Sequence, residues 1–287
     1  MGGYSIFDGT IADMTWVEVE QAAKKRAIML VPIGVIEQHG PHLPLGTDMY
    51  AGYLMCFLMK NELDRLGIAT VVAPPYYFGM NETTGMFPGS ITIRRESMIA
   101  VLTDIFVNYK KFGFGKQFIL NHHGDPQHND AIIQAILSAR EEDVDAVYVM
   151  GGFVQHFIEE AYASAYKKAL PLPPHAIIKA EESDKTKQAR VRLTKSDMHI
   201  HAEEKETSMI MRWYPDLLRK KDEIKTFKAV TPTAEEFATV LEGRWRDISP
   251  LGYIGDPSVA TEENGELYAY EAIDIASAIA KFLKQKK

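Results

Sequence analysis

Short apolar runs alternate with longer stretches of helical spacing along most of the chain. Nearly continuous apolar runs, as in strands covered on both faces of a parallel sheet, occur at 27–35, 68–73, 117–120 and 146–150. Helical spacing of apolar residues occurs at 49–66, 95–112, 129–139, 202–213, 233–241 and 268–283. Strands alternating with such helices predict βαβ units, and hence an α/β fold in which helices sandwich a mostly parallel sheet.

The pattern changes between residues 171 and 197, where prolines cluster and a charged run follows with little periodicity. This composition indicates a solvated loop or an added hairpin. The alternative is a lid over a site or an arm that reaches another subunit, because long loops in compact domains are often functional. We interpret the segment as an insertion in a single domain that spans residues 1–287.

The composition and charge of the chain exclude several classes of protein and several kinds of metal site. A chain of 287 residues that is 46% hydrophobic and 25% charged suits one large globular domain. Its single cysteine, Cys56, excludes an internal disulfide framework and a multi-cysteine zinc site, so histidines and carboxylates would have to hold any metal. The net charge of −7 argues against a nucleic-acid partner. The first residues lack the features of a secretory signal, and no run reaches the roughly 20 apolar residues of a membrane span. We therefore expect a cytoplasmic protein.

The first group of candidate functional residues follows the first strand, at 36–48. Ligands of open α/β sheets bind at the carboxyl ends of strands, which is where this group lies. Glu37 and His39 are two residues apart, so in an extended segment they point to the same side. Asp48 stands where the next helix would have its N-cap, but the intervening glycines and prolines could also return it to the same point. Two carboxylates and an imidazole suit Zn²⁺ or Mn²⁺. The alternative is a polar loop with a capping Asp48.

A second group, at 121–130, follows the third strand and should share the same rim of the sheet. Of the adjacent pair His122 and His123, one ring would ligate while the other packs, forms hydrogen bonds or faces substrate. Asp125 could be a ligand or a base. A helix N-terminus capped by Asn129 or Asp130 is the simpler interpretation, but it does not account for three histidines.

A third group lies at 199–208. If a helix begins near residue 202, His201 lies at its mouth and Glu206 about one turn further. A charged, solvated helix face explains Glu203 and its two following residues well. It explains His201 and Glu206 less well, because apolar residues follow them.

Together the three groups resemble the creatininase family. Gly34 to Asp48 matches that family's first motif almost letter for letter, and His201 to Ser208 matches a later one. Two further stretches, 85–91 and 255–257, also match. The resemblance implies a parallel α/β sandwich, a homohexamer and two divalent ions, Zn²⁺ and/or Mn²⁺. It also implies a histidine beside the reacting bond, His201. The metal ligands that it implies are Glu37, His39, Asp48, His123 and Glu206.

The chain departs from the family pattern at several positions. His122 and Glu203 replace glycines, and Asp125 stands where creatininase has a glutamate near its metals. Creatininase also has tryptophans near its substrate ring, whereas Trp16, Trp213 and Trp245 lie elsewhere in this sequence. We therefore expect no aromatic clamp for a flat heterocycle. The residues that indicate a more polar ligand are His122, Asp197, His199 and Glu203.

The function predicted is that of a divalent-metal-dependent hydrolase in which an activated water attacks a carbonyl of a small polar cyclic substrate. The bond would be a cyclic amide or another non-peptide C–N bond. Asp125 or Glu206 would orient the water, and His201 would give a proton to the leaving atom. One alternative is a ring-opening C–C hydrolase of a cyclic polyol ketone, such as 3-dehydro-scyllo-inosose. Another is a catalytically silent binding protein, which the five intact ligand positions argue against.

Overall fold

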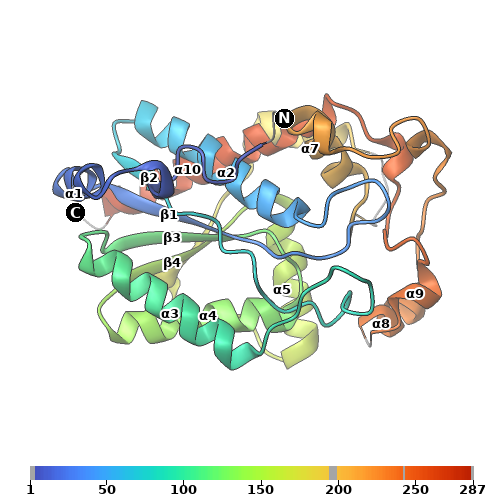
Figure 1. Ribbon diagram of the computed structural model, residues 1–287, viewed down its shortest axis with the longest axis horizontal. Helices are drawn as coiled ribbons and strands as arrows, with labels where there is room; N and C mark the ends of the chain where they lie inside the picture. Colours follow the sequence, from blue (N-terminus) through green and yellow to red (C-terminus); the bar gives the residue numbers. More distant parts are fainter. Residues whose placement is uncertain (1–3, 194–198, 242, 286–287) are drawn as a thin grey trace.

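A five-stranded parallel sheet forms the centre of the protein, in the order β2–β1–β3–β4–β5 (Figure 1). The computed structural model describes residues 4–193, 199–241 and 243–285, except for the side chains of residues 152–157, 161 and 241. The strands are β1 Ile28–Ile33, β2 Thr70–Val72, β3 Lys116–Asn121, β4 Asp145–Met150 and β5 Ile177–Lys179. This parallel sheet, flanked by helices, confirms the fold class expected from the sequence.

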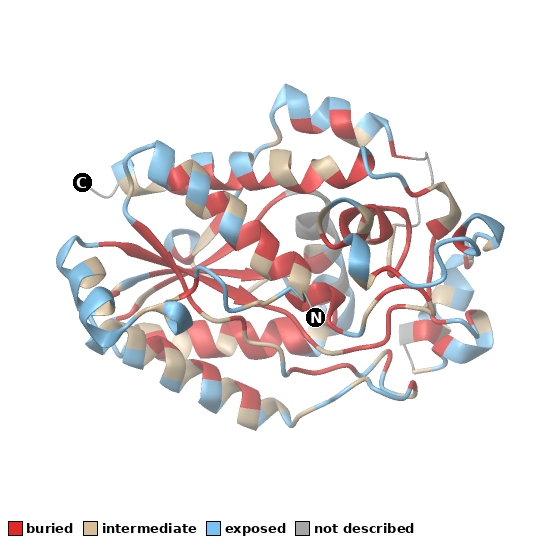
Figure 2. Ribbon diagram, turned by 45° about the horizontal axis from the view of Figure 1, so that its top comes forward, coloured by how far each residue is buried: buried red, intermediate tan, exposed pale blue. Residues whose placement is uncertain are grey.

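Helices cover both faces of the sheet (Figures 1 and 2). One face packs against α2 Thr47–Arg65, α7 Glu204–Trp213 and α10 Leu267–Gln285. The other packs against α3 Arg95–Lys111, α4 Pro126–Glu141 and α5 Gly152–Tyr166. Neighbours along a strand point to opposite faces, so Leu30 joins the first core and Val31 the second. All six residues of β1 are buried, which explains why the strand has a continuous apolar sequence.

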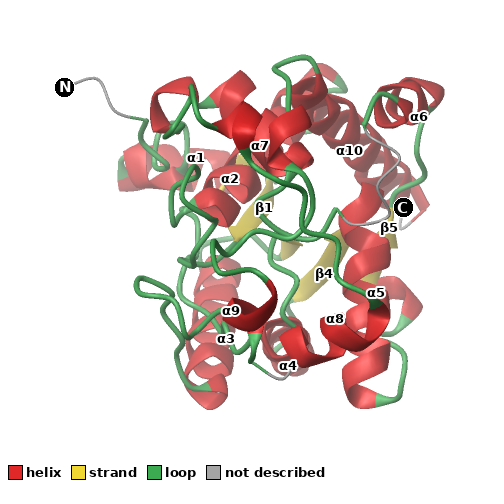
Figure 3. Ribbon diagram, turned by 90° about the vertical axis from the view of Figure 1, so that its right-hand side faces the viewer, coloured by secondary structure: helices red, strands yellow, loops and turns green. Residues whose placement is uncertain are grey.

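The remaining helices lie at the periphery. They are α1 Trp16–Lys24, α6 Asp184–Val191, α8 Ala234–Leu241 and α9 Trp245–Ile248. Helices α8 and α9 lie at the end of the molecule where the strands have their carboxyl ends, as Figure 3 shows from that side. They share a small separate hydrophobic cluster around Trp245 and Val240. No helix among the described residues is long and apolar enough to cross a membrane.

The expectation of a solvated loop or hairpin does not hold for the described part of 171–197. This segment contributes the edge strand β5, which pairs in parallel with β4, and the helix α6. Helix α6 attaches to α10 through polar groups and a small apolar cluster: Thr186 Oγ1 donates to Asp274 Oδ2 at 2.6 Å, Arg190 Nη2 contacts Glu271 Oε1 at 2.8 Å, and Ala189 packs with Leu267. A helix anchored in this way needs little apolar periodicity, and so the sequence pattern missed it. Asp197 lies outside the described residues.

The sheet brings the candidate site residues together. Strands β1 and β3 are neighbours, with Ile33 paired to Asn121 at their carboxyl ends. The stretches that follow these two strands carry Glu37 and His123, so both start from the same point on the rim, as the sequence predicted.

Candidate metal centre

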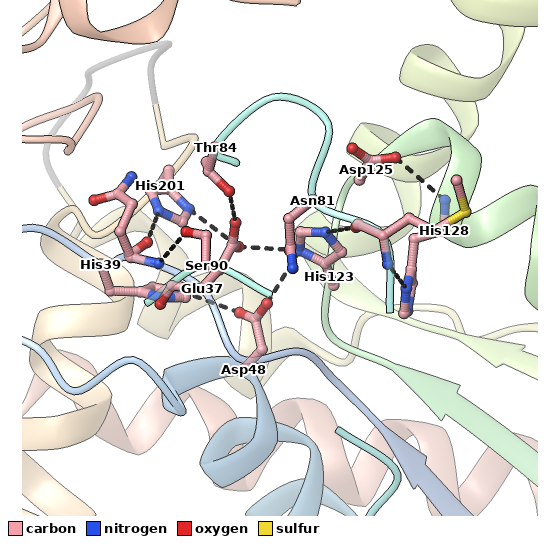
Figure 4. A network of polar contacts seen from close by, with 12 residues as sticks. Glu37, His39, Asp48, Asn81, Thr84, Ser90, His123, Asp125, His128 and His201 are labelled. Atoms are coloured by element: carbon pink, nitrogen blue, oxygen red, sulfur yellow. Dashed lines mark hydrogen bonds and ion pairs between the residues drawn. The ribbon is translucent and has the colours of Figure 1, made fainter. Parts of the chain in front are cut away.

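Six acidic and imidazole side chains converge at the carboxyl ends of β1 and β3, and Figure 4 labels all of them except Glu206. Ligand atoms of Glu37, Asp48 and His123 lie within 4.8 Å of one another, and so do those of His39, Asp48 and Glu206. A third group joins Glu37, His39 and His201. The structure thus brings together all five residues predicted as metal ligands, and Asp48 belongs to two of the groups.

Asp48 lies between His39 and His123 and faces each of them with a different oxygen. Its Oδ1 is 3.2 Å from His39 Nε2, and its Oδ2 is 3.1 Å from His123 Nδ1. It is not the helix cap considered from the sequence, because α2 begins at Thr47 after Gly46 and has no side-chain cap. The helix start lies against the end of β1, where a Cβ on Gly34 would be 2.8 Å from the carbonyl carbon of Asp48. Glycine at position 34 therefore permits the approach that places Asp48.

Backbone carbonyls fix the orientation of both histidine ligands. His39 Nδ1 donates to the Glu37 carbonyl at 3.1 Å, and His123 Nε2 donates to the Met80 carbonyl at 3.0 Å. The remaining ring nitrogens, Nε2 of His39 and Nδ1 of His123, face the carboxylates. When the rings are neutral, these nitrogens present their lone pairs there. Such partners on the far ring nitrogen are typical of metal-binding histidines, because they select the tautomer and hold the ring.

The third stretch supplies Glu206 and His201. Helix α7 begins at Glu204, two residues later than predicted, so Glu206 lies in its first turn. Its Oε2 accepts the Ala202 N–H at 2.6 Å and lies 3.8 Å from His39 Nε2. His201 Nε2 donates to the Gln38 carbonyl at 2.7 Å, which leaves Nδ1 facing Glu37 Oε1 at 3.8 Å. His201 is thus at the centre, next to the carboxylates.

Two of the carboxylates are held ionised by their histidine neighbours. Burial opposes the charge on Glu37, yet His123 holds its pKa below the ordinary value. Burial likewise opposes the charge on Asp48, yet His39 and His123 hold its pKa well below the usual range. Against the same penalty of burial, Asp48 and Glu206 raise the pKa of His39 to about 10.

Two features of the buried carboxylates fit a bound cation. Burial, reinforced by Asp48 and Glu203, raises the pKa of Glu206 to about 8. Asp48 Oδ2 is buried and accepts no hydrogen bond from any described residue, and it lies 3.1 Å from His123 Nδ1. Two electron-rich atoms at that distance require a proton or a cation between them. Carboxylate and imidazole donors suit Zn²⁺ or Mn²⁺, so these residues fit a divalent metal centre.

A pocket lies beside this cluster, and its volume, including the open space at its entrance, is about 850 Å³. Of the predicted substrate-binding residues, His122, His199 and Glu203 line it. His122 stacks on Tyr268 with ring centroids 5.5 Å apart, and burial lowers its pKa to about 4. His199 Nδ1 lies 2.7 Å from Glu203 Oε2. The fourth predicted residue, Asp197, cannot be placed because it is outside the described part of the chain.

Asp125 lines the pocket but belongs to none of the ligand groups found among the described residues. It is the N-cap of α4: Oδ1 accepts the N–H groups of Gln127 and His128, and Oδ2 accepts that of Glu82. The capping role considered for Asn129 and Asp130 is therefore wrong, because both lie inside the helix. Burial raises the pKa of Asp125. Its predicted role as base stays a prediction.

Several pocket residues were not predicted from the sequence. Trp245, expected to lie away from the site, lines the pocket and meets His201 edge-on with centroids 5.1 Å apart. Phe237, Lys205 and Tyr268 also line it. Thr84 donates to Glu37 Oε2. In the sequence, only the resemblance of residues 85–91 to the creatininase family indicated that the stretch around Thr84 lies near the site.

Comparisons with known proteins identify relatives of this chain. A family model described as creatinine amidohydrolase matches residues 12–280. A mycofactocin precursor peptide peptidase of Mycobacterium ulcerans is 26% identical over 259 residues, which is 88% of this chain and 85% of that protein. A 3-dehydro-scyllo-inosose hydrolase of Thermotoga maritima is 30% identical over 115 residues, which is 39% of this chain and 34% of that protein.

Solved structures share the fold. The crystal structure of a creatinine amidohydrolase (creatininase) has a TM-score of 0.67 at 19% identity, covering 95% of this chain and 97% of that chain. A structure described as creatininase Mn has a TM-score of 0.65 at 18% identity, with coverage of 95% and 98%. A creatininase mutant of Zn–Zn type has a TM-score of 0.63 at 18% identity, with coverage of 97% and 98%.

Proposed function

The chain belongs to the creatininase family, and from this premise we propose that it is a divalent-metal-dependent hydrolase. The substrate proposed is a small polar cyclic molecule with a carbonyl, cleaved at a cyclic amide or another non-peptide C–N bond. One observation carries the proposal: two groups of three potential ligands share Asp48, whose two oxygens face different histidines.

Each group would hold one ion, with Asp48 between them. Glu37 and His123 complete one ligand set, and His39 and Glu206 complete the other. The Mn and Zn–Zn forms of neighbouring structures support Mn²⁺ and Zn²⁺ as candidates. When bound, such ions lower the pKa of a coordinated water and polarise a carbonyl.

His201 is the residue proposed to move the proton. Burial and the nearby His39 lower its pKa to about 4, so the ring is neutral at neutral pH. With Nε2–H committed to the Gln38 carbonyl, Nδ1 is the atom that can accept a proton from the attacking water and then give it to the leaving nitrogen. Because it would receive that proton first, His201 acts as base and then as acid, which extends the donor role predicted from the sequence.

Glu206 and Asp125 are both candidates to orient the water. Glu206 has the stronger claim, because it belongs to a ligand group and both oxygens of Asp125 already accept backbone N–H groups. His122, His199 and Glu203 supply polar contacts for the substrate on another part of the pocket wall.

Hydrolysis of a peptide C–N bond is a second candidate function. The relative that matches over 88% of this chain is a peptidase, and Phe237 and Trp245 give the pocket an apolar side that could receive a side chain. A C–C hydrolase of a cyclic polyol ketone has weaker support, because the inosose hydrolase matches over only 39% of the chain.

A substrate panel with metal-loaded and metal-stripped protein tests the proposal. Lactams and other cyclic amides, short peptides and inososes are each incubated with the protein, and the release of amine or of an acyclic keto acid is followed. We expect amine from a cyclic amide, only in the metal-loaded sample. Amine from peptides alone would select the second candidate, and a keto acid would select the third. Equal turnover by stripped protein would refute metal dependence.

A further inference from the structure

We propose that Thr84 is a positioning residue of the metal centre. Its hydroxyl holds one oxygen of Glu37, so that the carboxylate presents only its other oxygen to an ion. The inference rests on the metal function proposed above, and it concerns how tightly one of the two ions is held. Glu37 would then bind an ion through one oxygen, and Thr84, which belongs to none of the ligand groups, would set the orientation of its carboxylate.

The contacts of Glu37 divide between its two oxygens. Thr84 Oγ1 donates to Oε2 at 2.5 Å (Figure 4). Oε1 faces the histidines, 3.0 Å from His123 Nδ1 and 3.8 Å from His201 Nδ1. Both Glu37 and Thr84 are about 1% exposed, so water has little access to replace the hydroxyl. Only Oε1 is therefore directed toward the ligand group.

Thr84 is itself held in place by a loop that closes on itself. The Ile93 N–H donates to the Gly79 carbonyl at 2.9 Å. Asn81 Nδ2 donates to the Ile91 carbonyl at 2.6 Å, and its N–H donates to Thr92 Oγ1 at 3.1 Å. These hydrogen bonds fix residues 79–84 against residues 91–93. The Thr84 hydroxyl is therefore already in position before a metal binds.

Residues 79–84 also hold His123, which belongs to the same proposed ligand group as Glu37. Met80 accepts the Nε2–H of His123 at 3.0 Å, and the Glu82 N–H donates to Asp125 at the start of α4 at 3.0 Å. Residues 79–84 therefore orient Glu37, which follows β1, and His123, which follows β3. Outer partners of this kind typically change metal affinity by about 10- to 100-fold when they are removed.

Replacing the hydroxyl with a methyl group isolates its contribution, because valine has nearly the shape of threonine. Metal-free wild type, Thr84→Val and Thr84→Ser are titrated with Mn²⁺ and with Zn²⁺ in competition with a chromogenic chelator. We expect Thr84→Val to weaken one of the two binding events by about 10- to 100-fold. Thr84→Ser should bind within a few-fold of wild type. The neighbouring Thr83→Val is the matched control and should leave metal affinity unchanged.

The outcomes separate the inference from the proposed function. If wild type itself binds neither metal, the proposed function fails. If wild type binds metal but Thr84→Val binds equally well, or Thr84→Ser is as weak as Thr84→Val, the positioning role is wrong while the metal function stands. Thermal unfolding of each metal-free variant shows whether it is folded. Should Thr84→Val not fold, Thr84→Ala takes its place, because it lacks the hydroxyl and introduces no larger group.

Discussion

Asp48 is the residue on which both proposed ions depend. It faces His39 with one oxygen and His123 with the other, whereas Glu206 belongs to one ligand group only. We expect Asp48→Asn to lose most of both ions, because an amide lacks the charge and offers a single oxygen. Glu206→Gln should keep about one ion per chain. Elemental analysis of the dialysed proteins measures this difference. Equal metal content in the two variants would contradict the shared position of Asp48.

The protonation of His39 makes metal binding depend on pH. With its pKa raised to about 10, this ring carries a proton in the metal-free protein at neutral pH, whereas a ligating imidazole must be neutral. Binding therefore releases that proton, and the affinity should rise with pH between pH 6 and 8. Glu37 and Asp48, whose pKa values are lowered, stay ionised in this range and do not reverse the trend.

Calorimetric titration of the metal-free protein with Zn²⁺, in two buffers of different ionisation enthalpy, counts the protons released. We expect at least about one for each protein chain near pH 7. A pH-independent affinity with no proton release would contradict the protonated state of His39.

At the scale of single residues, the sequence predicted which acidic and imidazole side chains meet better than it predicted their supporting contacts. Glu37, His39 and Asp48 are close in sequence and follow a strand, so their meeting needs only a local loop. Thr84 and Trp245 were missed because nothing local marks them. Thr84 reaches Glu37 across 47 positions, and Trp245 meets His201 from a peripheral helix. Only the path of the chain in space shows these contacts.

At the scale of elements, the N-cap of α4, Asp125, connects this helix to the segment 79–84 that supports the site. Asp125 accepts three backbone N–H groups, two from the first turn of α4 and one from Glu82. We expect Asp125→Ala to lower the free energy of unfolding by about 0.5–2 kcal/mol, the usual range for a lost N-cap. Asp125→Asn retains an acceptor oxygen and should lose less. Denaturant unfolding of both variants measures the difference.

The turnover of Asp125→Asn separates the two roles of this carboxylate. A general base contributes about 10²- to 10⁴-fold to the rate. Because both Asp125 oxygens are already engaged, we expect kcat to fall by less than about tenfold in this variant. A fall of a hundredfold with unchanged stability would instead support the base predicted from the sequence.

The longest apolar patterns gave the best predictions, whereas helices α1, α5 and α6 and strand β5 were not predicted. Strand β1 and helix α3 have long apolar patterns, and their observed bounds differ by only a few residues from the predicted ones. Strand β5 has only three residues, and two are buried in α6, Thr186 and Ala189. Such short or polar elements are stabilised by what they contact, and the sequence carries little sign of those contacts.

For the whole molecule, metal occupancy should appear as thermal stability. The proposed ligands come from widely separated stretches, so unfolding would release any bound metal. With free metal at a hundred times the Kd, one site adds about 2.7 kcal/mol. For a large domain this raises the Tm by about 5 °C or more. Calorimetry of protein with saturating Mn²⁺ against protein with a chelator measures the shift. Identical Tm values would contradict a metal centre that joins these stretches.

The position of the ligands along the chain sets an order for biosynthesis. Glu37, Asp48 and His123 all precede the midpoint of the sequence, whereas Glu206 is made much later. Since chains emerge from the ribosome N-terminus first, the Glu37–Asp48–His123 group is available before the group that requires α7. A growing polypeptide would thus contain the candidate ligands for one ion while those for the other are still untranslated.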